Sequence, residues 1–187
     1  MSAPYIVGIG GTLRPMSSSE KALRFTLARC QADGATTMCF AADKLGALPH
    51  YAPEDPSRVP EAKELIEELR RADGIVIASP GYHGSVSGLV KNALDYTEDM
   101  RDDDPAYLAG RPVGLIATAY GWQATVTTLE ALRSIVHALR GWPTPLGAAI
   151  NSSVKVFGDD GGVIDERVRF QLETVAREVI TGARALG

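Results

Sequence analysis

Residues 5–19, YIVGIGGTLRPMSSS, contain the pattern that decides the fold: an apolar stretch, a glycine-rich turn and a run of hydroxyl side chains. Residues 5–10 (YIVGIG) are apolar throughout, which is typical of a strand buried on both faces of a parallel sheet. Residues 20–31 then place Leu23 and Leu27 at helical spacing. This stretch therefore predicts a buried strand that leads through a tight turn into a helix.

The same alternation of short apolar runs and longer helical patterns continues along the chain. Further strands are expected at residues 35–41, 74–79, 112–118 and 146–150, and further helices at 61–72, 86–97, 125–140 and 166–183. The proline-rich residues 45–60 predict a long surface loop. Gly141 is expected to end the preceding helix as a left-handed C-cap, because Pro143 cannot continue it. The alternation predicts an α/β fold with a five-stranded parallel sheet and helices on both faces.

Length and composition fit one globular domain covering residues 1–187. The hydrophobic fraction of 45% and the charged fraction of 22% are ordinary for a globular protein and exclude a disordered or fibrous chain. A formal net charge of −4 argues against a nucleic-acid partner, which would favour a basic chain. The charge is uneven, however, because residues 1–30 hold four basic side chains and one acidic side chain, 4 − 1 = +3.

Cysteine content and hydropathy indicate the compartment. Cys30 and Cys39 are too few and too far apart for a disulfide scaffold or a zinc site, so both are expected to be reduced core thiols. No apolar run approaches the roughly 18 residues of a membrane span, and residues 1–4 do not begin a signal peptide. We therefore expect a cytoplasmic location, no membrane partner and no metal.

Ligands of open parallel α/β sheets bind beyond the carboxyl ends of the strands. The first such loop, residues 10–19, offers the hydroxyls of Thr12, Ser17 and Ser19, and the guanidinium of Arg14 matches phosphate oxygens. The start of the following helix adds free backbone amides, so a phosphate cradle is predicted. The loop lacks the third glycine of GxGxxG, and the chain has no GxxxxGK[ST] motif. The alternative is that the serines only cap the helix.

The loop after the third strand, residues 79–85 (SPGYHGS), is also unusual. Its glycines allow backbone amides to face a flat ligand, Tyr82 would lie along a ring, and His83 would donate to a ligand oxygen. A hydrolase elbow is excluded, because Val86 stands where GxSxG requires serine. The alternative is a tight turn with a packed tyrosine.

Together these loops resemble the NADPH-dependent FMN reductase family. Residues 11–19 (GTLRPMSSS) resemble the family's GSxRxxSxN phosphate loop, and residues 48–51 (LPHY) resemble its LPxY loop. Residues 79–95 (SPGYHGSVSGLVKNALD) resemble its TPEYNGSxPGxLKNAID segment, and the similarity spans at least residues 6–150. The chain departs from the family pattern at four positions, which are Thr12 for serine, Ser19 for asparagine, Gly81 for glutamate and His83 for asparagine.

The resemblance implies a flavodoxin-like fold, FMN as the cofactor, NADPH or NADH as the electron donor, and a homodimer or homotetramer. It assigns the FMN phosphate to Thr12, Arg14, Ser17 and Ser19. It assigns the flavin ring to two loops, formed by Pro80, Gly81, Tyr82, His83 and Gly84 and by Ala119, Tyr120, Gly121 and Trp122. For Trp122 the alternative is an anchor at a subunit interface.

The implied reaction is hydride transfer from a nicotinamide to flavin N5, so no catalytic side chain is expected. Residues 121–123 and 142–145 resemble family members that supply reduced flavin to a separate monooxygenase. One alternative is an FMN-bound quinone, azo or metal-oxyanion reductase. Others are a flavin-binding scaffold and a flavodoxin-type electron carrier, although the TxTGxT loop of flavodoxins is absent.

Overall fold

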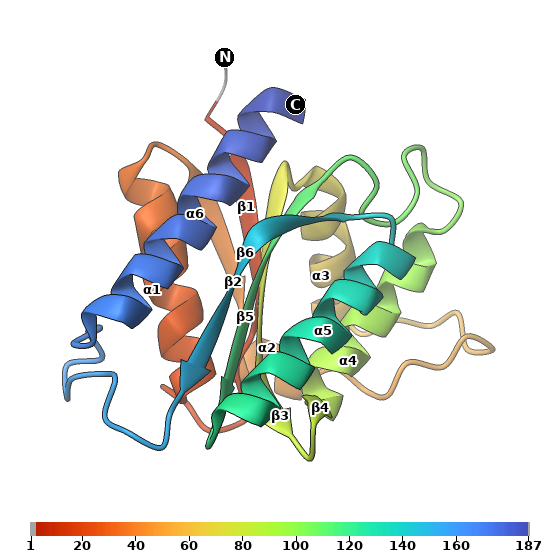
Figure 1. Ribbon diagram of the computed structural model, residues 1–187. Helices are drawn as coiled ribbons and strands as arrows, with labels where there is room; N and C mark the ends of the chain where they lie inside the picture. The colour runs from red at the N-terminus through yellow and green to blue at the C-terminus, as the bar shows by residue number, and fades with distance from the viewer. Residues whose placement is uncertain (1–2, 187) are drawn as a thin grey trace.

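The computed structural model describes residues 3–186. Within them, five strands form a parallel sheet in the order β2-β1-β3-β5-β6 (Figure 1). Their bounds are β1 Tyr5–Gly10, β2 Thr36–Phe40, β3 Gly74–Tyr82, β5 Pro112–Ala119 and β6 Trp142–Asn151. The predicted parallel α/β sheet is thus confirmed. A sixth strand, β4, spans only Ser85–Val86 and pairs antiparallel with the end of β3, which the sequence patterns did not predict.

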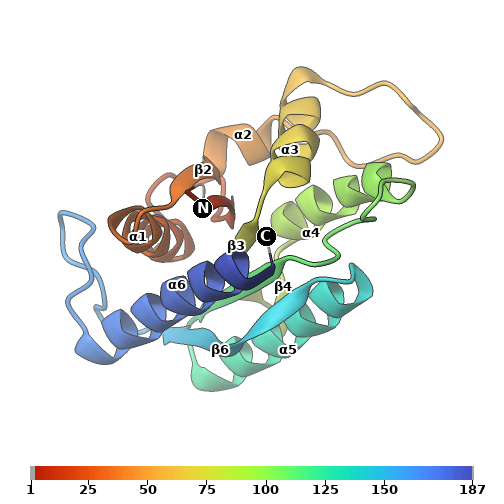
Figure 2. The ribbon, with the colours of Figure 1, turned by 90° about the horizontal axis from the view of Figure 1, so that it is seen from above.

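Helices cover both faces of the sheet, as Figure 2 shows. One face carries α1 (Ser18–Ala32) and α6 (Glu166–Leu186). The other face carries α3 (Pro60–Arg71), α4 (Gly88–Asp95) and α5 (Trp122–Ala138). Two short segments were not expected, namely the five-residue helix α2 (Ala42–Gly46) and the 3-10 helix η1 (Tyr96–Met100).

Each face of the sheet has its own hydrophobic core. Along β1, Ile6 packs with the core under α1 and α6, whereas Val7 and Ile9 pack with the core under α3, α4 and α5. All three side chains are fully buried, because the sheet is covered on both sides. This is why the strand reads as a continuous apolar run rather than as an alternating one.

The β6 region differs from the prediction in two ways. The strand begins at Trp142, four residues before the predicted start, and includes Pro143. Proline is tolerated because β6 is an edge strand with a register shift opposite Val113 to Leu115. The predicted left-handed C-cap at Gly141 is wrong, because Arg140 has the positive φ of 63°. Gly141 is close-packed instead, since a Cβ there would lie 2.9 Å from Val136.

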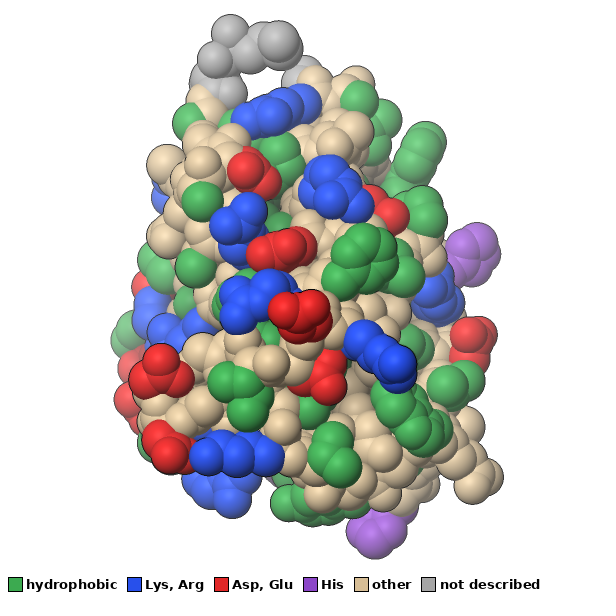
Figure 3. All heavy atoms as spheres, turned by 60° about the vertical axis from the view of Figure 1, so that its left-hand side comes forward, with side chains coloured by type: hydrophobic (Ala, Val, Ile, Leu, Met, Phe, Trp, Pro, Cys, Tyr) green, Lys and Arg blue, Asp and Glu red, His purple; other side chains and the backbone are tan. Residues whose placement is uncertain are grey.

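The distribution of surface charge and the burial of the two cysteine thiols are ordinary for a globular protein. On the side seen in Figure 3, basic and acidic side chains are interspersed and no broad patch of one sign appears. No helix among residues 3–186 has both the length and the apolar character needed to cross a lipid bilayer. Cys30 is buried and Cys39 half-buried, and both are free thiols. Burial raises the pKa of Cys30 to about 12, so this thiol stays protonated near neutral pH.

Candidate functional site

Three loops meet at the carboxyl ends of β1, β3 and β5, at the bottom of Figure 1. A pocket of about 120 Å³ lies between them, lined by Thr12, Arg14, Ser17, Ser18, Ser19, Pro80, Gly81, Tyr82, Thr118, Ala119, Tyr120 and Ser152. Two further pockets, of about 580 Å³ and 450 Å³, adjoin it and share the Tyr120 side chain. The three pockets together form a cleft with a narrow polar part and two wider parts.

The first loop is held in shape by the start of α1. Ser17 is the N-cap, and its hydroxyl accepts a hydrogen bond from the Glu20 backbone N–H at 3.3 Å. The buried Glu20 carboxylate accepts from the Met16 N–H at 2.9 Å, which holds Met16 at a positive φ of 56°. This reciprocal arrangement resembles a capping box. Gly10 is required here, because a Cβ would overlap the Ala78 carbonyl oxygen.

The cap interpretation accounts for only some of the polar groups in this loop. Ser17 caps the helix, and the Ser19 hydroxyl lies 3.3 Å from the Ser17 hydroxyl. Arg14 is exposed, lines the polar pocket, and its guanidinium has no hydrogen bond or ion pair with any residue from 3 to 186. An arginine without a partner, beside hydroxyls and a helix N-terminus, fits a phosphate group.

The second loop forms a tight hairpin between β3 and β4. His83 and Gly84 have positive φ values of 51° and 87°, the pattern of a type I′ turn. Tyr82 is 54% exposed and faces the cleft, so the alternative of a fully packed tyrosine is wrong. His83 is exposed at the tip of the hairpin and lines none of the three pockets of the cleft.

Gly81 explains one departure from the family pattern. A Cβ at this position would lie 2.6 Å from the Thr128 hydroxyl of α5 and 3.1 Å from the Ala124 carbonyl oxygen. Thr128 is fully buried, and its hydroxyl donates to the Ala124 carbonyl at 2.7 Å. A glutamate side chain would therefore force α5 away from the hairpin. Glycine at this position lets α5 pack directly against β3.

The third loop follows β5 and starts α5. Ala119 is buried, whereas Tyr120 is 84% exposed and Trp122 is 62% exposed. Gly121 has a positive φ of 140° and is the N-cap, without a side chain to cap the helix. Gly84, Tyr120, Gly121 and Trp122 line the 450 Å³ pocket. This part of the cleft therefore has aromatic walls and free backbone amides.

The cleft thus brings together all predicted site residues except His83. Sequence reasoning missed Thr118 and Ser152 in the polar pocket and Leu13 and Leu89 in the 580 Å³ pocket. Thr118 and Ser152 lie at the ends of β5 and β6, so the topology rule for ligands could have found them. Leu13 and Leu89 lie within the stretches that resemble the family, but at positions that its motifs leave open.

The LPHY segment is tied to the segment that begins after β3. The Asn92 side chain accepts from the Tyr51 N–H at 2.9 Å and donates to the Pro49 carbonyl at 2.8 Å. The Tyr96 hydroxyl donates to the same carbonyl at 3.0 Å. Two of the segments that carry the family resemblance therefore contact each other, at a distance from the polar pocket.

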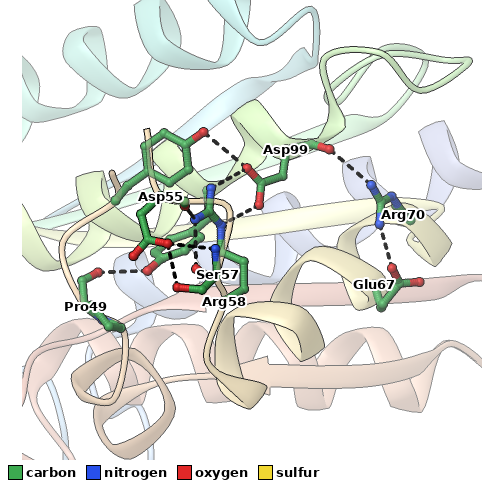
Figure 4. A network of polar contacts seen from close by, with 9 residues as sticks. Pro49, Asp55, Ser57, Arg58, Glu67, Arg70 and Asp99 are labelled. Carbon is green, nitrogen blue, oxygen red and sulfur yellow. Dashed lines mark hydrogen bonds and ion pairs between the residues drawn. The ribbon is translucent and has the colours of Figure 1, made fainter. Parts of the chain in front are cut away.

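Beside this segment, Arg58 is the centre of a polar network (Figure 4). Its guanidinium donates to both carboxylate oxygens of Asp99, at 2.7 Å and 2.9 Å. It also lies 4.9 Å from the Tyr51 ring centroid and 5.6 Å from that of Tyr96. The hydrogen bonds from Arg58 hold the pKa of Asp99 below its usual value. Because Arg58 pairs with Asp99 and also donates to the backbone carbonyls of Asp55 and Ser57, the network stabilises the loop.

The remaining titratable candidates do not form a site. His50 and His137 are both exposed in the single chain. The helical pattern around His137 predicts a side chain that is packed or at an interface, and its exposure leaves the interface as the prediction. The acidic run at residues 102–104 predicts a solvated turn, but Asp103 within it accepts a hydrogen bond from Arg70 at 2.7 Å. Within residues 3–186, no group of three His, Cys, Asp or Glu side chains is placed to hold a metal.

The fold and the cleft define a class, a flavodoxin-like α/β protein with polar groups at one end of its cleft and exposed aromatic rings at the other. Residues 4–155 match the family model for NADPH-dependent FMN reductase, and the chain belongs to that family.

Relatives of known name match part of the chain. An FMN-dependent NADPH-azoreductase of Staphylococcus haemolyticus (strain JCSC1435) is 36% identical over 110 residues, which are 59% of this chain and 55% of that protein. The protein of the same name from Staphylococcus aureus (strain USA300) matches with the same identity and coverage. The chain therefore spans about half the length of these curated relatives.

Solved structures match nearly the whole chain at low sequence identity. FerB, an NAD(P)H:(acceptor) oxidoreductase from Paracoccus denitrificans, has a TM-score of 0.79 and 20% identity, covering 99% of this chain and 100% of that chain. The apo form of an NADH:FMN oxidoreductase, EMOB, has a TM-score of 0.72 and 21% identity, with coverage of 99% and 91%. At these identities the similarity supports the flavodoxin-like fold.

Proposed function

We propose that this chain is an NAD(P)H-dependent FMN reductase and that the cleft at the carboxyl ends of β1, β3 and β5 binds FMN. The proposal rests on one observation above all. The unpartnered guanidinium of Arg14 faces the same pocket as Ser17 and Ser19 at the start of α1. A phosphate placed there would receive charge-assisted hydrogen bonds and the favourable field of the helix N-terminus.

The chain's own residues would position the two ring systems. Thr12, Arg14, Ser17 and Ser19 would hold the phosphate. Pro80, Gly81, Tyr82 and Gly84 would contact one side of the flavin ring, and Ala119, Tyr120, Gly121 and Trp122 the other. FMN, when bound, supplies the group that accepts electrons from the nicotinamide and passes them on. No side-chain acid or base is assigned, because the protein's role is to orient the rings and exclude water.

His83 has a smaller role in this proposal than the family pattern implies. Its side chain lies at the tip of the β3–β4 hairpin, outside the cleft. The neighbouring Gly84 supports a contribution from the backbone of this turn, because it lines the 450 Å³ pocket. We therefore propose that the His83 backbone, rather than its imidazole, contributes to ring binding.

The direct test is nicotinamide oxidation by the purified chain. Protein is mixed with FMN and either NADPH or NADH, and the loss of absorbance at the reduced-nicotinamide band is followed. We expect FMN-dependent oxidation of at least one donor. Binding of FMN without oxidation of either donor would favour a flavodoxin-type electron carrier and refute the reductase. No binding of FMN would refute the cofactor assignment itself.

A second candidate is a reductase that keeps FMN bound and reduces a flat aromatic acceptor, such as a quinone or azo compound. The second wide pocket, lined by Tyr120 and Trp122, favours it, because it leaves room for a second ring beside Tyr120. Gel filtration of the reduced holoenzyme distinguishes the two. Flavin that elutes with the protein supports the bound-cofactor enzyme, and flavin that separates supports release of reduced FMN as product.

The assembly and the cellular setting are also proposals. We propose that residues 1–187 act as one domain and that the chain forms a homodimer or homotetramer. The exposed Trp122 and Trp142 support such an interface, because large exposed aromatic rings are unusual on a free surface. A flavin-dependent monooxygenase is the proposed partner if reduced FMN is released. A cytoplasmic location is proposed from the free thiols.

A further inference from the structure

A small hairpin in the segment between β6 and α6 lies beside the start of α1 (Figure 1). An antiparallel bridge between Phe157 and Val163 joins its two arms. We call residues 156–164 the β6–α6 hairpin. The match to the family model ends at residue 155, so the hairpin lies outside the part of the chain that carries the family resemblance.

The β6–α6 hairpin is fixed to the body of the protein. Phe157 and Val163 are buried in the core under α1 and α6. The Asp165 carboxylate, directly after the hairpin, accepts hydrogen bonds from the Arg167 and Val168 N–H groups at 2.9 Å and 3.0 Å, as an N-cap side chain does. Because the core and α6 determine its position, the hairpin can hold a neighbouring segment in place.

The tip of the hairpin contacts the first loop of the cleft. Gly161 has a positive φ of 84°, and the Met16 methyl group lies over it, since a Cβ at Gly161 would be 3.1 Å from that methyl carbon. The Phe157 ring faces the Lys21 ammonium, which is 5.9 Å from the ring centroid. Met16 directly precedes the N-cap Ser17, and Lys21 lies in the first turn of α1. The hairpin therefore contacts both sides of this helix start.

Met16 is the residue whose backbone bends the first loop. Its φ of 56° lies in the left-handed region, which costs a residue other than glycine about 1–2 kcal/mol. This bend lies between Arg14 and Ser17, two of the residues assigned to the phosphate. The Glu20 carboxylate holds the Met16 N–H at 2.9 Å, and Gly161 leaves room for the Met16 side chain. An unfavourable backbone conformation persists only where its surroundings hold it, and such residues cluster at ligand sites.

We infer that the β6–α6 hairpin positions the first loop for phosphate binding and that Met16 is the positioning residue through which it acts. The contact between Gly161 and Met16 keeps Arg14 and Ser17 arranged for a phosphate before FMN binds. This inference rests on the proposed function, since it assumes that the first loop binds the FMN phosphate. A flavin without a phosphate should therefore be insensitive to the contact.

The experiment measures the dissociation constants of FMN and riboflavin by flavin fluorescence in wild type, Met16→Ala and Met16→Leu. Met16→Ala removes the side chain that lies over Gly161. We expect its FMN affinity to fall about three- to tenfold, because the loop must then be ordered on binding. Its riboflavin affinity should stay within about twofold of wild type. Met16→Leu keeps an apolar side chain of similar volume, so its FMN affinity should stay within about twofold of wild type.

A second pair of variants changes the contact from the hairpin side. Gly161→Leu would occupy the space of the Met16 methyl group. Gly110→Leu is the matched control, because Gly110 has a similar φ of 78° and a Cβ there would have no atom within 4 Å. Both substitutions carry the cost of a side chain at positive φ, and thermal unfolding measures that shared cost. Only Gly161→Leu should weaken FMN about three- to tenfold while riboflavin binding is kept.

The selectivity between the two flavins distinguishes positioning from a merely structural role. Weaker binding of FMN but not of riboflavin by Met16→Ala, with normal binding by Met16→Leu, supports the inference. Equal FMN binding by Met16→Ala and wild type would overturn it, and so would equal losses for both flavins. If Met16→Ala does not fold, the comparison of Gly161→Leu with Gly110→Leu decides by the same criteria. A wild type that binds FMN no more tightly than riboflavin would instead contradict the proposed function.

Discussion

Two arginines in this molecule stand in opposite situations. Arg58 donates to both oxygens of Asp99 and lies against two tyrosine rings, and its side chain is 11% exposed. Arg14 is exposed in a loop of the cleft and has no partner within residues 3–186. The two side chains have the same chemistry. The two arginines differ in whether neighbouring residues of the protein supply hydrogen-bond acceptors for the guanidinium.

The comparison separates stability from binding. Around Arg58 the fold itself supplies each hydrogen-bond acceptor, so the group holds the proline-rich segment in place. Around Arg14 the described part of the chain supplies none, although Arg14 lines a pocket at the carboxyl ends of the strands. Polar groups that a fold leaves unpaired in a pocket are available to a ligand. Substitutions around Arg58 should therefore lower the stability of the fold, whereas substitutions around Arg14 should lower the affinity for FMN.

The largest expected effect is on FMN binding by Arg14→Ala. Loss of a charge-assisted contact to the phosphate should weaken FMN by about 2 kcal/mol, or about 30-fold. Riboflavin binding and the unfolding temperature should change little, because Arg14 has no partner in the protein. Calorimetric titration measures the binding. Arg167→Ala is the matched control, since that exposed arginine of α6 also has no side-chain partner within residues 3–186. Equal losses in the two variants would point to net charge rather than to a phosphate contact.

Arg58→Ala should give the reverse pattern. The substitution removes two hydrogen bonds to Asp99 and two contacts with aromatic rings, which should lower the free energy of unfolding by about 2 kcal/mol. FMN affinity should stay within about twofold of wild type, because the network lies outside the cleft. Urea unfolding measures the first quantity. A large loss of FMN affinity without a loss of stability would contradict the claim that the Arg58 network stabilises the fold and does not bind the ligand.

The smallest expected effect is the pH dependence of stability from Asp99. Its pKa is lowered in the folded state, first by the hydrogen bonds from Arg58, so the carboxylate stabilises the fold above its unfolded pKa. That contribution is lost as the pH falls through the folded pKa. Wild type should therefore lose up to about 1 kcal/mol more stability between pH 5 and pH 3 than Asp99→Asn does. Identical acid unfolding of the two proteins would show that the ion pair contributes nothing.

The strands could be predicted because a parallel sheet buries both faces, so β1, β3 and β5 appear as continuous apolar runs. The start of β6 could not be predicted from the sequence. Pro143 and Pro145 are tolerated in it only because β6 is an edge strand with a register shift. The hairpin after β3 was predicted as a turn, but the pairing of Ser85 and Val86 depends on two positive φ values.

For the candidate site, local motifs predicted the residues of the first loop but not those of the pocket wall. Arg14 and Ser17 stand in a motif with distinctive spacing, so the sequence itself identifies them. Thr118 stands in a buried apolar run, and only the arrangement of the strand ends places it in the polar pocket. The role of His83 stays a prediction: the motif shows which residue follows Tyr82, but not that this residue has a positive φ at the tip of the β3–β4 hairpin.

The most direct test of the central claim is a comparison of FMN and riboflavin affinity in the wild-type protein. The two flavins share the ring and the ribityl chain and differ only in the phosphate. If the unpaired groups of the first loop bind that phosphate, FMN should bind at least about 30-fold more tightly than riboflavin. Equal affinities would contradict the claim that this loop is a phosphate site.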